Sequence, residues 1–340
     1  MQPKLTLVTG ATGFVGAAVA RELEAAGYSL RLMHRAQADL SNLDGLRGQR
    51  VIADLRERSS LEAAVAGCDA VFHVAADYRL WVRDPAQMYA SNVDGSCALL
   101  QAAATAGVHR FVYTSSVATL RAGADGRVAD ETTPTQLEDM IGHYKRSKFL
   151  AEQAVLSFAK TMAMEIVTVK PSTPIGPRDI KPTPTGKVIR DAACGRIPAF
   201  VNTGLNIVHV DDVAVGHRLA FERGRNARSY VLGGTDMSLK LILETVAELM
   251  GRAPPRVQLP LQLLLPLAYV VEAWSHLTAA KDEPLLTLDG LRMARYQMFY
   301  SSARARAELG YEPRQPRLAI ADALHWFADH DYLPSAPTKT

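Results

Sequence analysis

Apolar and polar residues follow two different spacings along the first half of the chain. Short apolar, β-branched runs predict buried strands, and the stretches between them place apolar residues at helical intervals. The runs that predict strands cover residues 4–9, 29–33, 50–55, 69–74, 108–113 and 166–170, and the clearest helical stretches cover 17–24, 59–66 and 142–152. This alternation predicts an α/β fold: a doubly wound parallel sheet with helices on both faces and ligands at the carboxyl ends of its strands.

The pattern changes after about residue 171. Five prolines between residues 171 and 184 make a loop-rich stretch, and a helix is predicted at 188–194. The segment 259–277 is strongly apolar, but its prolines and the polar Gln262, Glu272 and His276 make it a poor membrane span. We interpret it as an amphipathic surface or lid helix, in preference to a segment that lies on a membrane.

The composition is that of an ordinary globular protein. The 340 residues are 48% hydrophobic and 21% charged, enough for one large or two medium domains. A net charge of +3, spread along the chain, does not indicate nucleic-acid binding. Three widely spaced cysteines indicate a reduced protein with neither a disulfide framework nor a metal site. Because the first strand begins by residue 4, there is no room for a signal peptide, and we expect a cytoplasmic protein.

A glycine-rich turn joins the first strand to the first helix. Such a turn places a pyrophosphate at the helix N-terminus, where unpaired N–H groups and the positive end of the helix dipole favour an anion. Gly10 lets the chain turn, Gly13 leaves room for phosphates, and Gly16 lets the helix approach the sheet. The motif predicts a dinucleotide-binding site of the Rossmann type, whose turn also includes Thr12, Phe14 and Val15.

The end of the second strand bears on the choice of cofactor. An acidic residue there would bind the 2′-OH of an adenosine ribose, but none occurs before Asp39. Arg35 would instead favour a 2′-phosphate through a charge-assisted contact. We therefore expect NADP in preference to NAD; the alternative is that Arg35 is a solvated loop residue.

The ends of the next two strands add candidates. Asp54 could accept a hydrogen bond from the adenine amino group while Leu55 covers a ring edge, or Asp54 simply precedes the next helix. Ala75 and Ala76 are small enough for a cofactor to approach the fourth strand. His73 lies in an apolar run, so we interpret it as a core residue rather than a catalytic one.

Tyr144 and Lys148 lie four residues apart on a predicted helix and share one face. A phenol ordinarily ionises at about pH 10, and a nearby ammonium lowers its pKa. Such a tyrosine can exchange a proton with a substrate hydroxyl or carbonyl while a hydride moves to or from a nicotinamide. The spacing is common in ordinary helices; its position after a strand that ends in Ser115 and Ser116 makes it informative.

Together these motifs resemble the extended, epimerase/dehydratase branch of the short-chain dehydrogenase/reductase superfamily. The glycine-rich turn, Thr-Ser-Ser at 114–116, the tyrosine–lysine pair and Asn-Val-Asp-Gly at 92–95 stand in the order of that branch. The resemblance implies a nucleotide-binding domain over 1–170 and a mainly substrate-binding or lid domain over 171–335, with some later segments returning to the first domain.

The resemblance also implies roles for individual residues. Ser116 would bind the substrate oxygen, with Ser115 beside it, and Tyr144 would be the acid/base. Lys148 would also hold the nicotinamide ribose, and Asn92 would support the proton relay. Three residues would lie beside the nicotinamide: Pro171, Ser172 and Thr173.

The substrate is less determined. Nucleotide-sugar epimerases carry an Arg-Asp pair where this chain has Leu205 and Asn206, and loss of the arginine puts a nucleoside-diphosphate sugar in doubt. Arg178 could supply another cation. His209 is closer to dihydroflavonol-reductase-like and hydroxysteroid-dehydrogenase-like members, which reduce carbonyls on apolar substrates. The resemblance therefore favours a carbonyl reductase, and a sugar epimerase with tightly bound NAD(P) is the alternative.

Three segments, 73–81, 141–152 and 171–187, most resemble the bacterial hopanoid-associated sugar epimerases. That group implies a lipid pathway, with a lipid-linked or sugar-derived small molecule as substrate, and leaves the reaction open. Asp77 and Tyr78 follow the fourth strand and could line the substrate pocket. An aromatic loop packed on the second domain explains them equally well.

The remaining expectations concern alternatives and assembly. A non-catalytic dinucleotide sensor is a minor alternative, against which the complete tyrosine–lysine pair argues. Peripheral contact of 259–277 with the inner membrane and a two-fold homodimer, the latter by analogy with the family, are further expectations. The branch's returning strand and helix start is expected at 208–213, with Asp211 or Asp212 as the helix N-cap.

Overall fold

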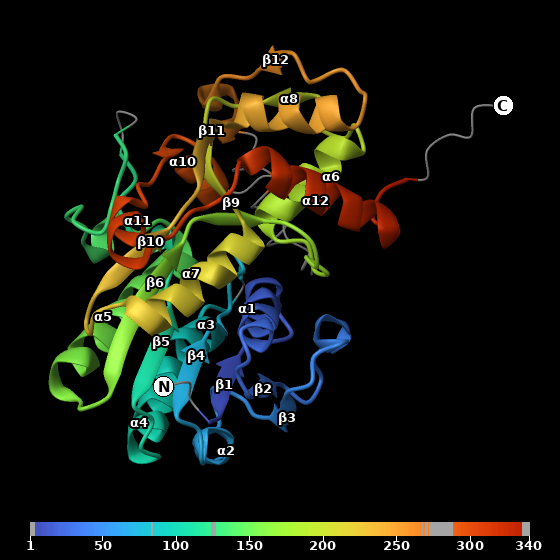
Figure 1. Ribbon diagram of the computed structural model, residues 1–340. Helices are drawn as coiled ribbons and strands as arrows, with labels where there is room; N and C mark the ends of the chain where they lie inside the picture. The colour runs from blue at the N-terminus through green and yellow to red at the C-terminus, as the bar shows by residue number, and fades with distance from the viewer. Residues whose placement is uncertain are drawn as a thin grey trace.

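A seven-stranded parallel sheet forms the centre of the computed structural model, which describes residues 4–82, 84–123, 127–266, 268, 271 and 288–334 (Figure 1). The strand order is β10-β6-β5-β4-β1-β2-β3. This result confirms the predicted doubly wound α/β fold, and each predicted strand of the first half overlaps an observed one. The strands are β1 Thr6–Thr9, β2 Leu30–His34, β3 Gln49–Ile52, β4 Ala70–His73, β5 Arg110–Thr114, β6 Glu165–Pro171 and β10 Ser229–Leu232.

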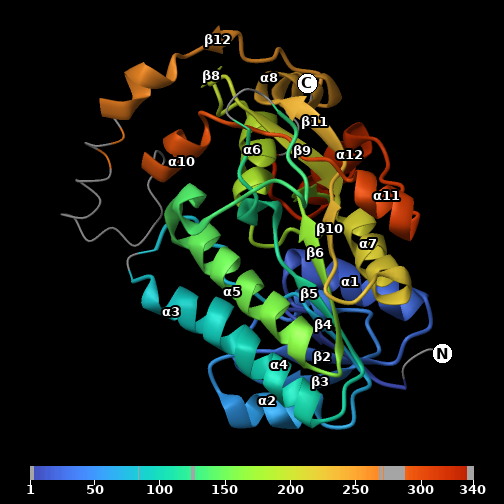
Figure 2. The same cartoon turned by 90° about the vertical axis from the view of Figure 1, so that its left-hand side faces the viewer.

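Helices cover both faces of this sheet, because successive strand residues point to opposite sides. In β1, Leu7 packs into the core beneath α2, α4 and α5, whereas Val8 packs into the core beneath α1 and α7. Figure 2 shows α4 and α5 on one side of the sheet and α1 with α7 on the other. The helices are α1 Phe14–Ala25, α2 Arg58–Val65, α3 Ala86–Tyr89, α4 Gly95–Thr105, α5 Gly142–Thr161, α7 Val210–Arg223 and α11 Ala303–Leu309.

A second, smaller layer lies beyond the carboxyl ends of the large sheet (Figure 1). In it, β9 (Gly204–His209) pairs with β7 (Thr173–Ile175), β11 (Thr235–Ser238) and β13 (Gln297–Met298). A separate apolar core joins β7, β9 and β11 to the neighbouring helices. The other elements of this part are α6 Pro184–Ala193, β8 Ala199–Phe200, α8 Leu239–Leu249, β12 Val257–Gln258, α10 Leu288–Met293 and α12 Pro316–Asp329. The chain returns to the large sheet through α7, β10 and α11.

The N-cap of α7 differs from the expectation. His209, not Asp211 or Asp212, caps the helix, because its Nδ1 accepts the backbone N–H of Asp211 at 3.0 Å. The two carboxylates are engaged elsewhere: Asp211 accepts from Arg178, and Asp212 accepts from Arg314. An imidazole at the end of β9 therefore does the work that short acidic side chains commonly do.

The apolar segment 259–277 is described only at 259–266, 268 and 271; its other residues, and with them most of the expected lid or membrane contact, lie outside the described residues. In the described part, Leu263 exposes 69% of its surface. No helix among the residues that the structure describes combines the length and apolar character that a membrane crossing requires.

Candidate active site

The glycine-rich turn is packed so tightly that side chains would not fit. Gly10 has a φ of 68°, and a Cβ there would lie 2.8 Å from the backbone of Ala75. A Cβ on Gly16 would lie 2.0 Å from the carbonyl oxygen of Gly10, so α1 approaches the turn as closely as its backbone allows. Gly13 is the exposed N-cap, and the half-buried Thr12, Phe14 and Val15 flank it.

The N-terminus of α1 suits an anion. Its N-cap provides no side-chain hydrogen bond, and its first turn contains no acidic residue. The first N–H groups of a helix and its dipole favour a bound phosphate. A second feature that suits a bound dinucleotide lies at the end of β6. The Ser172 hydroxyl is buried there without a hydrogen-bond partner, although the backbone N–H of Ser172 donates to the Leu232 carbonyl. Both features fit a dinucleotide that extends along the carboxyl edge of the sheet, past Ala75 and Ala76 towards residues 171–173.

His73 is a core residue, in agreement with its interpretation from the sequence. Its ring nitrogens bond the hydroxyls of Thr9 and Ser96, at 2.8 and 2.9 Å. Burial lowers the pKa of His73 to about 3, so the ring is neutral at physiological pH. The Thr9 hydroxyl oxygen also accepts the N–H groups of Val74 and Ala75, which fixes the backbone beside the glycine-rich turn.

Arg35 and Asp54 lie near one another at the neighbouring strand ends. The Asp54 carboxylate accepts hydrogen bonds from the Arg56 side chain, at 2.7 and 3.0 Å, and these bonds lower the pKa of Asp54 to about 2. The charge of the exposed Arg35 contributes to the same shift. Leu55 packs against Gly95 of α4, which confines it beside the sheet. An adenine contact of Asp54 would therefore share a carboxylate that Arg56 already holds.

Ser116 and Tyr144 meet at the carboxyl end of β5. Ser116 caps the 3₁₀ turn Val117–Thr119, where its Oγ accepts the N–H of Ala118 at 3.1 Å. Tyr144 lies in the first turn of α5, and its phenol is close enough to the Ser116 side chain for that hydroxyl to influence its pKa. Burial raises the pKa of Tyr144, and the Ser116 hydroxyl opposes this shift only in part. The phenol is therefore protonated at neutral pH and can donate its proton.

Lys148 is buried and faces β5 rather than the Tyr144 phenol. Its Nζ donates to the carbonyl of Thr114 at 2.7 Å and to the hydroxyl of Tyr113 at 3.1 Å. Burial lowers the pKa of Lys148 to about 7, with a further contribution from the charge of Lys170. We expected this ammonium to lower the pKa of Tyr144, and the structure does not show that effect. Lys148 is hydrogen-bonded to β5 instead, and burial disfavours its charged form.

Asn92 holds the loop that follows β4. Its Oδ1 accepts the N–H of Asp77 at 2.7 Å, and its Nδ2 donates to the Asp77 carbonyl and to the Ser147 hydroxyl. It lies in the π-helical turn Ala90–Asp94, which interrupts the helix between α3 and α4. The contacts of its side chain are thus with the loop and with α5; a part in a proton relay stays a prediction.

A buried polar cluster behind Ser116 was not expected from the sequence. Glu152 accepts hydrogen bonds from Ser115, Thr119 and Lys170. The Ser115 hydroxyl therefore points to Glu152, which places it in this cluster rather than beside a substrate. Two signals could have revealed the cluster: Glu152 follows Lys148 by one helical turn, and Lys170 interrupts an apolar strand.

The remaining substrate candidates lie in two places. Tyr78 is exposed, and Asp77 forms an ion pair with Arg79, both in the loop that Asn92 holds. Arg178 lies elsewhere: it donates to Asp211 at 2.9 Å, and Asn42 bridges its carbonyl to that of Thr12. The contacts of Arg178 therefore connect it with the glycine-rich turn and α7.

Asn206 is structural. Its side chain bonds Asp236, the carbonyl of Tyr300 and the N–H of Gly234 within the smaller sheet. Its neighbour Leu205, which stands where the Arg-Asp pair has its arginine, has no charge to offer a substrate diphosphate.

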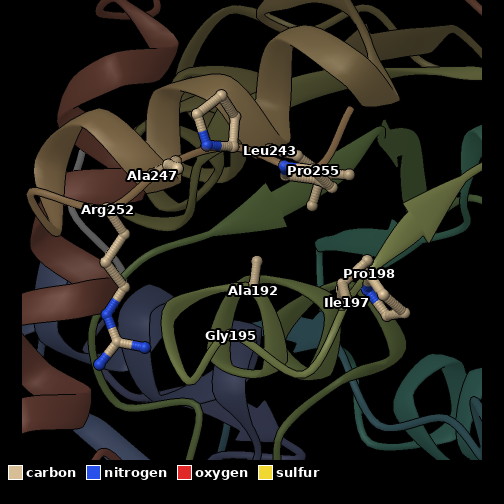
Figure 3. A pocket seen from close by; sticks show the side chains of 10 residues that line it. Ala192, Gly195, Ile197, Pro198, Leu243, Ala247, Arg252 and Pro255 are labelled. Atoms are coloured by element: carbon tan, nitrogen blue, oxygen red, sulfur yellow. The ribbon is translucent and has the colours of Figure 1, made fainter. Parts of the chain in front are cut away.

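Two cavities of the smaller layer lie away from these residues. One, of about 200 Å³, lies between α6 and α8 and is lined mainly by apolar side chains together with Arg252 (Figure 3). The other, of about 410 Å³, is lined by residues 258–262, Leu265, Asn202 and Arg295. Neither is lined by a predicted cofactor or catalytic residue, so neither defines the reaction.

Comparisons with known proteins agree with this geometry. The chain is 43% identical, over 96% of its length and 95% of the relative's, to a Synechocystis sp. protein provisionally named a dihydroflavonol 4-reductase. It is 33% identical to sterol demethylase protein B of Methylococcus capsulatus, over 96% of this chain and 99% of that protein. The crystal structure of gox2253 matches with a TM-score of 0.88 and 48% identity, covering 97% of this chain and 100% of that one.

More distant structures share the fold alone. A UDP-glucose 4-epimerase of Thermotoga maritima has a TM-score of 0.78 at 20% identity, covering 96% of this chain and 99% of that one.

The family of the chain follows from a match to a family model. The model of the NAD dependent epimerase/dehydratase family matches residues 6–233, from β1 through β10. Together with the close relatives, this match shows an enzyme of the oxidoreductase or epimerase type: the chain belongs to the NAD-dependent epimerase/dehydratase family.

Proposed function

We propose that this protein is an NADP-dependent carbonyl reductase that acts on a ketone of an apolar or lipid-linked molecule. The observation that carries the proposal is the pairing of Ser116 with a protonated Tyr144 at the carboxyl edge of the sheet, beyond the glycine-rich turn. The names of its relatives support the substrate class, because they include a dihydroflavonol 4-reductase of Zea mays and sterol demethylase protein B.

The chain's own residues would bind the ketone and move the proton. A bound nicotinamide dinucleotide supplies the hydride. Ser116 and Tyr144 would hold the substrate oxygen, and Tyr144 would protonate that oxygen as negative charge develops on it. Lys148, which bonds the Thr114 carbonyl and Tyr113, would hold a ribose hydroxyl, and the Ser172 hydroxyl would bond a polar group of the cofactor. Burial keeps the Tyr144 phenol protonated at neutral pH, which is the form that a proton donor needs when a ketone is reduced.

A direct absorbance assay distinguishes a carbonyl reductase from a sugar epimerase. Purified protein is mixed with NADPH and either a dihydroflavonol or a 3-ketosteroid, and nicotinamide absorbance is followed. A reductase consumes one NADPH for each ketone reduced. Conversion of a UDP-sugar without net change in absorbance, by protein that retains bound NAD(P) on purification, would instead establish the sugar epimerase.

The preference for NADP rests on Arg35. Replacement by alanine removes a charge-assisted contact with the 2′-phosphate, and we expect the Kd of NADPH to rise roughly 10- to 100-fold while that of NADH stays within about twofold. Nicotinamide fluorescence titration measures both constants. Arg47→Ala is the matched control, because Arg47 precedes β3 and so lies at the amino-terminal ends of the strands. Equal binding of NADH and NADPH by the wild type would overturn the preference and favour an epimerase.

We also propose that the protein is a cytoplasmic homodimer that touches the inner membrane through segment 259–277. The exposed Leu263 and the apolar composition of the segment support the contact. Cosedimentation with anionic liposomes is expected to recover the wild type in the pellet and Leu263→Glu in the supernatant. Wild-type protein that stays wholly in the supernatant would refute the membrane contact. Light scattering measures the dimer, which rests on analogy with the family.

A further inference from the structure

The carboxylate of Glu152 connects three elements behind the candidate active site. Oε2 accepts hydrogen bonds from the Ser115 hydroxyl and, at 2.9 Å, from the Thr119 hydroxyl. Oε1 accepts from the Lys170 ammonium, which also donates to Thr119 at 2.8 Å. All four side chains are buried. We call this set of Glu152, Ser115, Thr119 and Lys170 the Glu152 clasp.

The clasp holds both ends of the short segment that carries Ser116. Ser115 precedes Ser116 directly, and Thr119 ends the 3₁₀ turn that Ser116 caps. Thr119 also donates to the Ser116 carbonyl at 2.8 Å, so its single hydroxyl proton is shared between that carbonyl and Glu152. Because Ser115 and Thr119 are anchored to the same carboxylate, the backbone of Ser116 has little freedom to shift relative to α5.

The same carboxylate joins this segment to the helix of the proton donor. Glu152 follows Tyr144 by eight residues and Lys148 by four on α5. Lys170 lies at the end of β6, directly before residues 171–173. The clasp therefore connects three parts of the chain: the segment that carries Ser116, the helix that carries Tyr144, and the end of β6 before the predicted nicotinamide contacts.

A buried ion pair is a poor means of holding a fold together. The desolvation of two charges offsets most of their attraction, and apolar residues of similar size often stabilise a protein as well or better. What an ion pair with several hydrogen bonds provides is directional geometry, to within a few tenths of an ångström. The position of the clasp, directly behind Ser116, is where such geometry matters.

We propose that Glu152 is a positioning residue of the active site. It keeps the Ser116 hydroxyl at a fixed position relative to the Tyr144 phenol. Glu152 does not touch the substrate; it acts through Ser115 and Thr119. This inference rests on the proposed function, because it assigns to Ser116 and Tyr144 the substrate oxygen.

The test compares Glu152→Gln with the wild type and with Glu62→Gln, a matched change in an exposed ion pair on α2. Glutamine keeps the size of the side chain but loses the charge and one acceptor. Since misplacement by about an ångström can lower a rate about 100-fold, we expect kcat for ketone reduction to fall about 10- to 100-fold. The KM and the Kd of NADPH are expected to stay within about threefold. Glu62→Gln is expected to match the wild type.

Hydrogen exchange gives a readout that does not depend on activity. Backbone amides of residues 114–120 are expected to gain more exchange in Glu152→Gln than those of β1 and α1, which also exchange faster because the Lys170 ammonium is left buried without its counter-ion. A merely structural role would instead raise exchange by the same factor across the whole sheet. Ser115→Ala is the second variant, for the case in which Glu152→Gln does not fold: it keeps every charge and removes one donor. We expect faster exchange in the same peptide and a kcat lower by roughly three- to tenfold.

The outcomes separate the two proposals. A wild type that reduces ketones, together with variants that keep both the wild-type kcat and the wild-type exchange at 114–120, would overturn the clasp. A wild type without reductase activity would overturn the proposed function. The exchange of residues 114–120 in Ser115→Ala would still decide whether the clasp holds the Ser116 segment.

Discussion

Tyr144→Phe is expected to lower kcat for ketone reduction by about 10²- to 10⁴-fold, the range that removal of a general acid produces. Phenylalanine keeps the ring but has no proton to give to the oxygen that becomes negative during hydride transfer. Burial holds the wild-type phenol in its protonated form at neutral pH, so the loss of that proton is the whole of the expected effect. Stopped-flow measurement of NADPH oxidation under single-turnover conditions isolates this step.

The binding of NADPH to Tyr144→Phe is expected to stay close to that of the wild type. Tyr28→Phe is the matched control, because it removes a phenol that donates to Glu222. Tyr28 precedes β2 and so lies at the amino-terminal ends of the strands, away from the candidate active site. A Tyr144→Phe variant that reduces ketones at the wild-type rate would exclude Tyr144 as the proton donor. A variant that keeps both cofactor binding and cellular role would favour a dinucleotide sensor.

Lys170→Met is expected to lower the free energy of unfolding by about 3–5 kcal/mol, because it leaves the Glu152 carboxylate buried without its cation. The hydroxyls of Ser115 and Thr119 still donate to that carboxylate but do not neutralise it. Urea unfolding followed by circular dichroism measures the change. The double variant Lys170→Met/Glu152→Gln removes both charges and is expected to regain most of the loss.

An exposed pair provides the comparison. Arg58 and Glu62 pair on the surface of α2, with 64% and 59% of their side chains exposed. Arg58→Met is expected to change the free energy of unfolding by less than about 1 kcal/mol, since water screens the pair and solvates the remaining charge. If Lys170→Met were as mild as Arg58→Met, the carboxylate of Glu152 would not depend on Lys170 for its burial.

Local patterns of the sequence determined most of what is visible around the large sheet. The alternation of strands with helices predicted the parallel sheet, because burial on both faces requires continuous apolar strands and one-sided helices. The glycine-rich turn predicted a phosphate site, because its geometry depends on three residues within one turn. The neutral core character of His73 was predicted from its apolar neighbours. Each of these inferences uses residues that are close together in the chain.

Only the tertiary structure decided which distant groups meet. The spacing of Tyr144 and Lys148 placed both on one helix face, but only the packing of α5 on β5 showed that the ammonium bonds Thr114 and Tyr113. The clasp joins residues 115, 119, 152 and 170, which no local pattern relates. His209 caps α7 because the helix begins at Val210, which leaves Asp211 and Asp212 inside its first turn. Hydrogen bonds between side chains depend on positions to within a fraction of an ångström, and only the folded chain sets those positions.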